Sequence, residues 1–165
     1  MYRKKDFMIS LQIFDIKEIM EKLLIKESFD TFYFLEAKAL TSACLTLSGK
    51  RNSGWYDDAE KELMNGMPDY LFWREAKPTL YQYIKGKKTP HILNITLKLP
   101  KEQCEEELRQ KDVDFLLHFR FEKEVLLLVS GCNYHTFQMD KSADYLWDDY
   151  IKQLLKKWKI SFREG

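Results

Sequence analysis

The stretch "VDFLLHFRFE", residues 113–122, with "VLLLVSG" at residues 125–131, gives the clearest indication of the fold. Apolar side chains of the first segment recur at every second position: Phe115, Leu117, Phe119 and Phe121. The positions between them hold Asp114, Leu116, His118 and Arg120. Because side chains of a strand point alternately to its two faces, this spacing predicts a strand with one apolar face. The short separation from the second apolar run predicts a hairpin.

Similar segments occur earlier in the chain. "HILNITLKL", residues 91–99, alternates cleanly between apolar and polar side chains. "TFYFLEAKALT" (31–41) and "ACLTLSGKR" (43–51) are rich in the aromatic and β-branched residues that strands favour. A further short strand is predicted over residues 9–13, where apolar and polar residues also alternate.

Two helices are predicted in the first half of the chain. The first follows Asp15, which we expect to cap it with Glu18 as the partner in a capping box. The second extends from Pro68 to Lys85. Pro78 lies inside the second helix and lacks an N–H group, so we expect it to kink or divide that helix.

Two more helices are predicted in the second half. "PKEQCEEELRQK", residues 100–111, is typical of a polar helix. The C-terminal segment from residue 136 to residue 160 has apolar residues at helical spacing and predicts one long helix. Trp73, Trp147 and Trp158 lie on apolar helical faces and are expected in the core, whereas Trp55 follows an acidic loop and is a candidate contact residue.

The pattern as a whole indicates an α+β fold. With 165 residues, of which 45% are hydrophobic, the chain is expected to form one domain over residues 1–165. We expect a mostly antiparallel sheet with helices packed on one face. The order strand, helix, two strands, helix occurs twice, so a duplicated β-α-β-β-α unit is one interpretation.

Composition bounds the location and the partners. The 27 Lys+Arg and 26 Asp+Glu give a formal charge of +1, so no overall field attracts nucleic acid or an anionic membrane. The three cysteines are far apart, which favours a reducing compartment and indicates no disulfide framework. No apolar run approaches the roughly 20 residues of a membrane helix. A cytoplasmic location and no membrane partner are therefore expected, and a homo-oligomer is one expected state.

Residues Gly86 to Thr89 contain a glycine, two lysines and a threonine, as phosphate-binding loops do. A Walker A loop needs another glycine five positions earlier, where Tyr81 stands, and leads from a strand into a helix. Here Gly86 follows a helix, and we interpret it as a helix end signal. What remains is a cluster of cations that could contact nucleic acid: Arg74, Lys77, Lys85, Lys87 and Lys88.

A second candidate site is the polar face of the predicted sheet. It would bind a ligand or an anion through His118, Arg120, Lys98, Asn94 and Lys38. His118 could also serve acid–base chemistry, which would make the chain a small enzyme. We predict no metal site, because Cys132, His135 and a distant His118 are too few ligands, and we predict no cofactor. The adjacent pairs Asp57 with Asp58 and Asp148 with Asp149 are expected on solvated faces.

Three blocks of the sequence together resemble a family of small uncharacterised bacterial proteins, a domain of unknown function: "MISLQIFDIKEIMEKLLI", "FWREAKPTLYQYIKGKKTP" and "TFQMDKSADYLWDDYIKQLLKKW". The resemblance covers nearly the whole chain and implies a cytoplasmic bacterial protein without assigned catalytic residues. We therefore expect a non-enzymatic binding or assembly module. A nucleic-acid-associated protein using the cationic cluster and a small enzyme centred on His118 and Arg120 are the alternatives.

Overall fold

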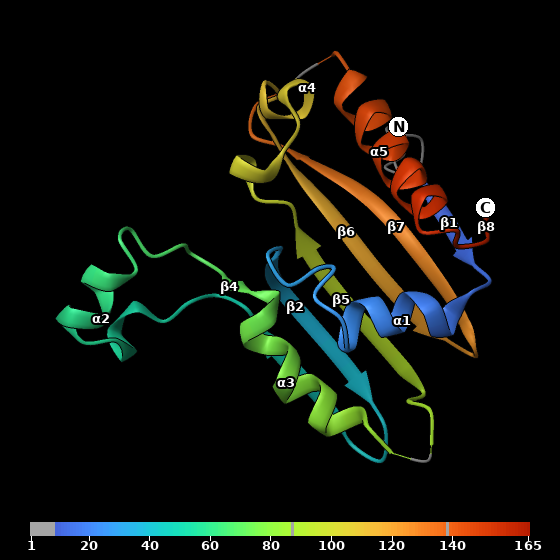
Figure 1. Cartoon of the computed structure of the whole chain (residues 1–165), viewed down its shortest axis with the longest axis horizontal. Helices are drawn as coiled ribbons and strands as arrows, with labels where there is room; N and C mark the ends of the chain where they lie inside the picture. The colour runs from blue at the N-terminus through green and yellow to red at the C-terminus, as the bar shows by residue number, and fades with distance from the viewer. Residues whose placement is uncertain (1–8, 87, 138) are drawn as a thin grey trace.

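A computed structural model describes residues 9–86, 88–137 and 139–165. Within them, eight strands form one antiparallel sheet in the order β3-β2-β5-β6-β7-β1-β8, with β4 paired to β2 beyond the end of β3 (Figure 1). The strands are β1 (Ser10–Ile13), β2 (Tyr33–Leu40), β3 (Cys44–Ser48), β4 (Leu71–Phe72), β5 (Ile92–Lys98), β6 (Val113–Glu122), β7 (Val125–Tyr134) and β8 (Phe162–Glu164). The helices are α1 (Ile16–Leu24), α2 (Asp58–Leu63), α3 (Trp73–Ile84), α4 (Glu106–Arg109) and α5 (Ser142–Lys157). The predicted single-domain α+β fold is confirmed.

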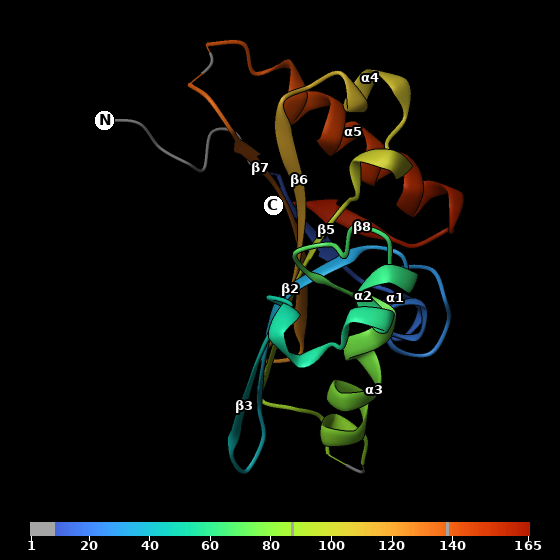
Figure 2. The same cartoon turned by 90° about the vertical axis from the view of Figure 1, so that its left-hand side faces the viewer.

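All five helices lie on the same side of the sheet, as Figure 2 shows in a view along its edge. The alternation in the strands places one set of side chains under these helices. Fully buried members of this set include Leu11, Phe34, Ile95, Phe115 and Phe119. Trp73 of α3 and Trp147 of α5 pack into the same core at 0% and 1% exposure. The other side chains of β2, β5 and β6 form a polar face that no described helix covers.

The β6–β7 hairpin is formed as predicted and continues beyond the predicted end to Tyr134. Its two-residue turn consists of Lys123 and Glu124, with φ angles of +52° and +61°. Two consecutive positive φ angles are what a two-residue hairpin needs to match the twist of its strands. Pairing along the full length of both strands holds these two non-glycine residues in a conformation that they disfavour.

Strand β2 contains a bulge that decides which of its side chains reach the polar face. The register with β5 shifts between Phe34 and Glu36, and the buried positions are Phe34, Ala37 and Ala39. A strict alternation from Phe34 would bury Glu36 and Lys38. One extra residue in the strand reverses the alternation, so both charged side chains point away from the core.

The two halves of the chain do not repeat each other in space. β5 pairs with its neighbour in sequence, β6, whereas β1 pairs with β7 and β8 and lies far from β2. Helix α1 crosses the sheet to connect β1 to β2 (Figure 1). The strand pairing therefore gives no support to a duplicated β-α-β-β-α unit.

Helix α1 begins where predicted but is capped differently. Asp15 is the N-cap residue, yet its side chain makes no capping hydrogen bond. Its carboxylate accepts a hydrogen bond from the backbone N–H of Ser161, at 2.6 Å. The predicted capping box with Glu18 is therefore wrong, because the C-terminal segment next to β8 takes the acceptor. A capping box forms instead at α2, between Asp57 and Glu60.

Helix α3 begins at Trp73 and not at Pro68, because Leu71 and Phe72 pair with β2 as strand β4. Pro78 lies inside one continuous helix, so the predicted division at this proline is wrong. The helix ends at Ile84, and Gly86 follows with a φ of +156°, a conformation that side chains disfavour. The end signal at Gly86 is confirmed.

The predicted polar helix over residues 100–111 is replaced by a 3₁₀ turn at Lys101–Gln103 and by α4. Cys104 and Glu105 between them have extended backbone angles. This break places Cys104 and Leu108 in the core, each 3% exposed. The C-terminal helix is also shorter than predicted, because residues 162–164 form the edge strand β8.

Candidate ligand site on the open sheet face

A row of three polar side chains crosses the centre of the open sheet face. Lys38 of β2 is the register partner of Asn94 of β5, and Asn94 is the register partner of Arg120 of β6. Neighbouring strands lie about 4.8 Å apart, so the amide lies between the two cations with about 10 Å from the first strand to the third. The sheet thus brings together three of the five residues predicted for this site.

A second row runs parallel to the first. Glu36, Thr96 and His118 are register partners on the same three strands. The Thr96 hydroxyl and Nδ1 of His118 share a hydrogen bond of 3.0 Å. On its other side the imidazole lies over Gly131 of β7, where an added Cβ atom would be 3.3 Å from Nε2. The absence of a side chain at Gly131 therefore gives the ring its place in the sheet face.

The environment of His118 favours the neutral imidazole. Burial lowers the pKa of His118, and the positive charge of Arg120 lowers it further. Both effects disfavour a second proton on the ring. At neutral pH the side chain is therefore an uncharged hydrogen-bonding group beside a permanent cation.

The two rows surround a hollow of about 600 Å³. Its lining includes Asn94, Thr96, His118, Arg120, Glu122 and Lys123. A second hollow of about 420 Å³ adjoins it between β2 and β3 and is lined by Lys38 and Thr46. Glu36, Asn94 and Thr96 contribute to both hollows, so the row of three residues extends from one into the other.

The central row has unused hydrogen-bonding capacity. Within the described part of the chain, Lys38, Asn94 and Arg120 make no side-chain hydrogen bond or ion pair to another protein group. Arg120 is exposed, and the other two side chains lie on the same open face. Two cations and an amide without protein partners form a site that can accept an anion through charge-assisted hydrogen bonds.

Lys98, the remaining residue predicted for the site, is engaged elsewhere. It lies on the same face, but its amine is 3.3 Å from a carboxylate oxygen of Asp114. His135 also contacts Asp114, at 3.0 Å from Nε2, and contacts Asp112 at 2.7 Å from Nδ1. Hydrogen bonds to these two carboxylates raise the pKa of His135. Lys98 thus belongs to a separate charged cluster at the end of β6 and is removed from the ligand site.

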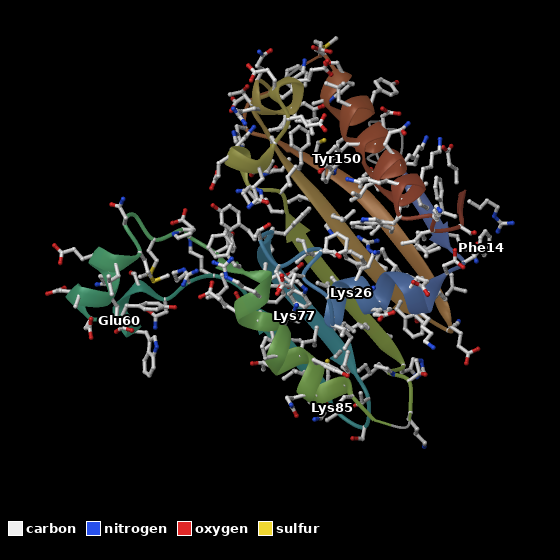
Figure 3. All side chains as sticks on the ribbon, in the orientation of Figure 1. Phe14, Lys26, Glu60, Lys77, Lys85 and Tyr150 are labelled. Carbon is white, nitrogen blue, oxygen red and sulfur yellow. The ribbon has the colours of Figure 1, made fainter. Side chains whose placement is uncertain are left out.

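The cations predicted to contact nucleic acid are spread along α3 and beyond it. The Arg74 guanidinium lies 4.5 Å over the ring of Phe72. The Lys77 amine pairs with Asp30 and donates to the carbonyl of Lys26 at 3.0 Å, and Figure 3 shows it near Lys26 and away from Lys85. Two of the five cations therefore have protein partners.

The other three members of that cluster follow the end of α3. Lys85 and Lys88 line a groove between α1 and α3. Lys87 lies outside the described residues. The five cations therefore form no single surface, although two of them share the groove.

Sequence reasoning missed a polar cluster beneath α5. Asp144 and Asp148 lie one turn apart and face β7, where the Tyr134 hydroxyl donates to Asp144 and the Ser130 hydroxyl donates to Asp148. Asp144 is 4% exposed. The expectation that Asp148 lies on a solvated face is wrong, since burial and the charge of Asp144 raise its pKa. The four-residue spacing of the two carboxylates was the available signal.

Arg51 was also missed. Its guanidinium is 7% exposed and forms hydrogen bonds to both carboxylate oxygens of Glu75, at 3.2 and 2.8 Å, and to the hydroxyl of Tyr56 at 2.9 Å. It also donates to the backbone carbonyls of Pro68 and Tyr70. No local pattern indicates this role, because the partners are up to 24 residues away.

Two classes of site can be compared with the described residues as a whole. No group of three or more His, Cys, Asp or Glu side chains among them is placed to hold a metal ion. Likewise, none of the helices in these residues has the length and apolarity needed to cross a membrane. A location in the cytoplasm stays a prediction.

The fold and the site define a single-domain α+β protein with an eight-stranded antiparallel sheet and one open polar face. Comparison with known families assigns the chain to a family: residues 22–163 match the Family of unknown function (DUF5721), and the chain belongs to it. The predicted resemblance to a domain of unknown function is thereby confirmed. No curated protein and no solved structure matches the chain.

Proposed function

We propose that this chain is a non-enzymatic binding module that holds a small anionic ligand, a carboxylate or a phosphate, on its open sheet face. The observation that carries this proposal is the row of Lys38, Asn94 and Arg120, whose side chains have no partner among the described residues. Ion-pair formation inside the fold would have been the simplest way to stabilise these charges. Three adjacent groups without such a partner are better explained by a ligand.

The chemistry of the row defines the ligand further. The guanidinium of Arg120 can bind a carboxylate or phosphate with two parallel hydrogen bonds, whereas Lys38 acts as a point charge. Glu36, beside Lys38 on the same face, disfavours a second negative charge at that end. We therefore expect a ligand with one anionic group near Arg120 and hydrogen-bond donors near Glu36.

The test is a titration of the full chain with inorganic phosphate and, separately, with succinate, followed by backbone NMR. Shifts concentrated at Asn94, Thr96 and Arg120 are expected, with binding weakened at least tenfold in Arg120→Ala and in Lys38→Ala. Lys156→Ala is the matched control, since Lys156 is an exposed cation on α5, across the sheet. Shifts spread over the whole surface, or equal binding in all three variants, would contradict the proposal.

An enzymatic role is the second candidate because one observation favours it. The Thr96 hydroxyl is hydrogen-bonded to the neutral imidazole of His118 beside Arg120, and a base next to a hydroxyl is one way to activate a nucleophile. In such sites a third group usually orients the base, and Nε2 of His118 lies over Gly131 with no such group among the described residues. Turnover of a model ester that is abolished in Thr96→Val would favour the enzyme over the binding module.

The nucleic-acid alternative receives less support. Arg74 and Lys77 have partners within the fold, so fewer cations are available than the sequence predicts. Phosphate contacts are strongest at low ionic strength. A gel shift with duplex DNA and with RNA at low salt is therefore decisive, and no retardation is expected.

A further inference from the structure

Residues 52–67 form an arm that extends from the body of the molecule, shown in Figure 1 with α2 at its end. None of the residues of its 3₁₀ turn (Ser53–Trp55) or of α2 is buried. Two large apolar side chains on it are almost fully exposed, Trp55 at 79% and Leu63 at 87%. Exposed apolar groups on a projecting element are typical of an interaction site.

The arm has a defined conformation. The Asp57 carboxylate accepts from the backbone N–H of Glu60 at 2.7 Å, and the Glu60 carboxylate accepts from that of Asp57 at 3.0 Å. Arg51 holds the two ends of the arm together through Tyr56 and the carbonyl of Pro68. An element held in this way loses little conformational entropy on docking.

The arm is acidic. Residues 52–67 contain four carboxylates against one lysine, Lys61, which gives a net charge of −3. The carboxylates are Asp57, Asp58, Glu60 and Glu62, and all four are exposed. Figure 3 shows Glu60 at the tip of the molecule, far from the sheet.

The groove between α1 and the end of α3 has the complementary character. Its volume is about 660 Å³. Apolar lining comes from Met20, Leu24, Ile25, Tyr81 and Ile84. Ile25 is 56% exposed, so the groove is open to solvent.

The charged residues of the groove oppose those of the arm. Lys17, Lys85 and Lys88 line it together with one acidic residue, Glu21, which gives a net charge of +2. A basic, apolar groove and an acidic arm with exposed apolar side chains are complementary in both charge and hydrophobicity.

The arm does not reach the groove of its own chain. Its base lies at Glu75 in the first turn of α3, whereas Lys85 follows the last turn. Twelve residues of helix at about 1.5 Å each separate these ends by about 18 Å, and the arm points away from the groove (Figure 1). A second copy of the chain can supply the arm that this groove fits.

We infer that two copies of the chain associate by exchanging arms, with the arm of each copy docked in the α1–α3 groove of the other. Each copy carries both halves of the contact, so a two-fold axis satisfies both at once and closes the assembly. This contact uses surfaces separate from the open sheet face and does not depend on the proposed ligand.

The experiment uses sedimentation equilibrium of the full chain with two charge-reversed variants. The arm variant is Asp58→Lys with Glu62→Lys, which leaves the capping box intact and changes the net charge of the arm from −3 to +1. The groove variant is Lys17→Glu with Lys88→Glu, which changes the groove from +2 to −2. In each variant alone, arm and groove carry the same sign, and in their mixture both cross-contacts carry opposite signs.

The wild-type chain is expected to dimerise, and each variant to dimerise at least tenfold more weakly. An equimolar mixture of the two variants is expected to recover association. Leu63→Ser, a change at a fully exposed site, is expected to weaken the dimer without altering the melting temperature. Lys156→Glu on α5 is the control and should leave association unchanged.

A wild-type chain that stays monomeric up to millimolar concentration would overturn the inference. So would a dimer that is unaffected by the arm and groove variants, or a mixture that associates no better than either variant alone. Circular dichroism of each variant confirms that it is folded before its association is interpreted.

Discussion

A buried indole connects each of the two longest helices to another element of the fold. Nε1 of Trp73 in α3 donates to the carbonyl of Leu23 in α1 at 2.7 Å, and Nε1 of Trp147 in α5 donates to that of Leu116 in β6 at 2.8 Å. Both residues were predicted to be core residues, and both are confirmed. At this scale each side chain fills volume and also satisfies a backbone acceptor at a specific place.

Trp73→Phe is expected to lower the free energy of unfolding by about 2–4 kcal/mol, because it leaves a cavity and removes the donor to the Leu23 carbonyl. Urea denaturation measures the change. Trp55→Phe is the matched control, since Trp55 is 79% exposed, and its effect should stay within about 0.5 kcal/mol. Equal losses in the two variants would show that the core position of Trp73 is not what matters.

Two histidines should give opposite pH dependences of stability. The pKa of His118 is lowered by burial and Arg120, so the unfolded chain binds its proton more tightly and stability falls as pH drops below about 6.5. The pKa of His135 is raised by hydrogen bonds to Asp112 and Asp114. Its contribution is complete below the ordinary pKa and is lost as pH rises through the raised value.

Unfolding free energies of His118→Gln and His135→Gln between pH 5 and pH 8.5 test this pair of expectations. The first variant should lose less stability than wild type on acidification below pH 6.5. The second should be flatter than wild type above that pH. A direct check is the NMR titration of the ring protons, and a higher pKa for His118 than for His135 would refute the assignment.

At the scale of elements, the end of β3 depends on the close approach of two backbones. Gly49 follows β3, donates to the carbonyl of Leu35 at 2.7 Å and accepts from the N–H of Leu71 at 2.9 Å. An added Cβ atom would lie 1.8 Å from the carbonyl oxygen of Phe34. Strands β2, β3 and β4 can meet at this point only because the residue has no side chain.

Gly49→Ala is therefore expected to destabilise the fold by at least about 3 kcal/mol, since the clash is with backbone and cannot be relieved by a side-chain rotation. Thermal and urea unfolding provide the measurement. Gly54→Ala in the arm is the control, because the nearest atom there is 3.3 Å away and belongs to a side chain. If the alanine at position 49 were as harmless as that at position 54, the close approach would be refuted.

Helix ends show where element-level prediction succeeds and where it fails. The capping box of α2 uses residues three apart in sequence, and the exposed short helix was predicted. At α1 the predicted cap residue is correct, yet its carboxylate bonds to Ser161, 146 residues away. A local rule gives the position of such a residue but not its partner when a distant donor competes.

At the scale of the whole molecule, the arm is an addition to a body that can fold without it. Lys50 and Tyr70 form a bridge at its base, and Arg51 keeps its ion pair with Glu75 in the body. The chain therefore returns to the sheet close to the point where it leaves. The folding energy of the body depends little on what lies between.

Replacing residues 53–67 by three glycines is expected to change the free energy of unfolding by no more than about 1 kcal/mol, because only exposed contacts are lost and the loop becomes shorter. The variant should unfold in one cooperative transition. It should also lose self-association, which links it to the proposed arm exchange. A loss of cooperative unfolding would show that the arm belongs to the core.

The polar face shows how much of the candidate site could be predicted. Alternation in β5 and β6 placed Asn94, His118 and Arg120 on one face, and the strand pairing brings Lys38 into the same row. Lys98 satisfies the same alternation but pairs with Asp114. Period alone gives the face of a side chain, whereas its partner depends on the register and on residues beyond the strand.

The sequence by itself determined the strand and helix periods, the β6–β7 hairpin, the buried tryptophans and the fold class, because these depend on residues within a few positions of one another. Only the tertiary structure decided that β1 lies beside β7, that β8 closes the edge, and that a bulge turns Glu36 and Lys38 outward. It also decided that Arg51 joins the base of the arm to α3. These features arise from contacts between distant segments, whose energy depends on the packing of the complete sheet and not on any local pattern.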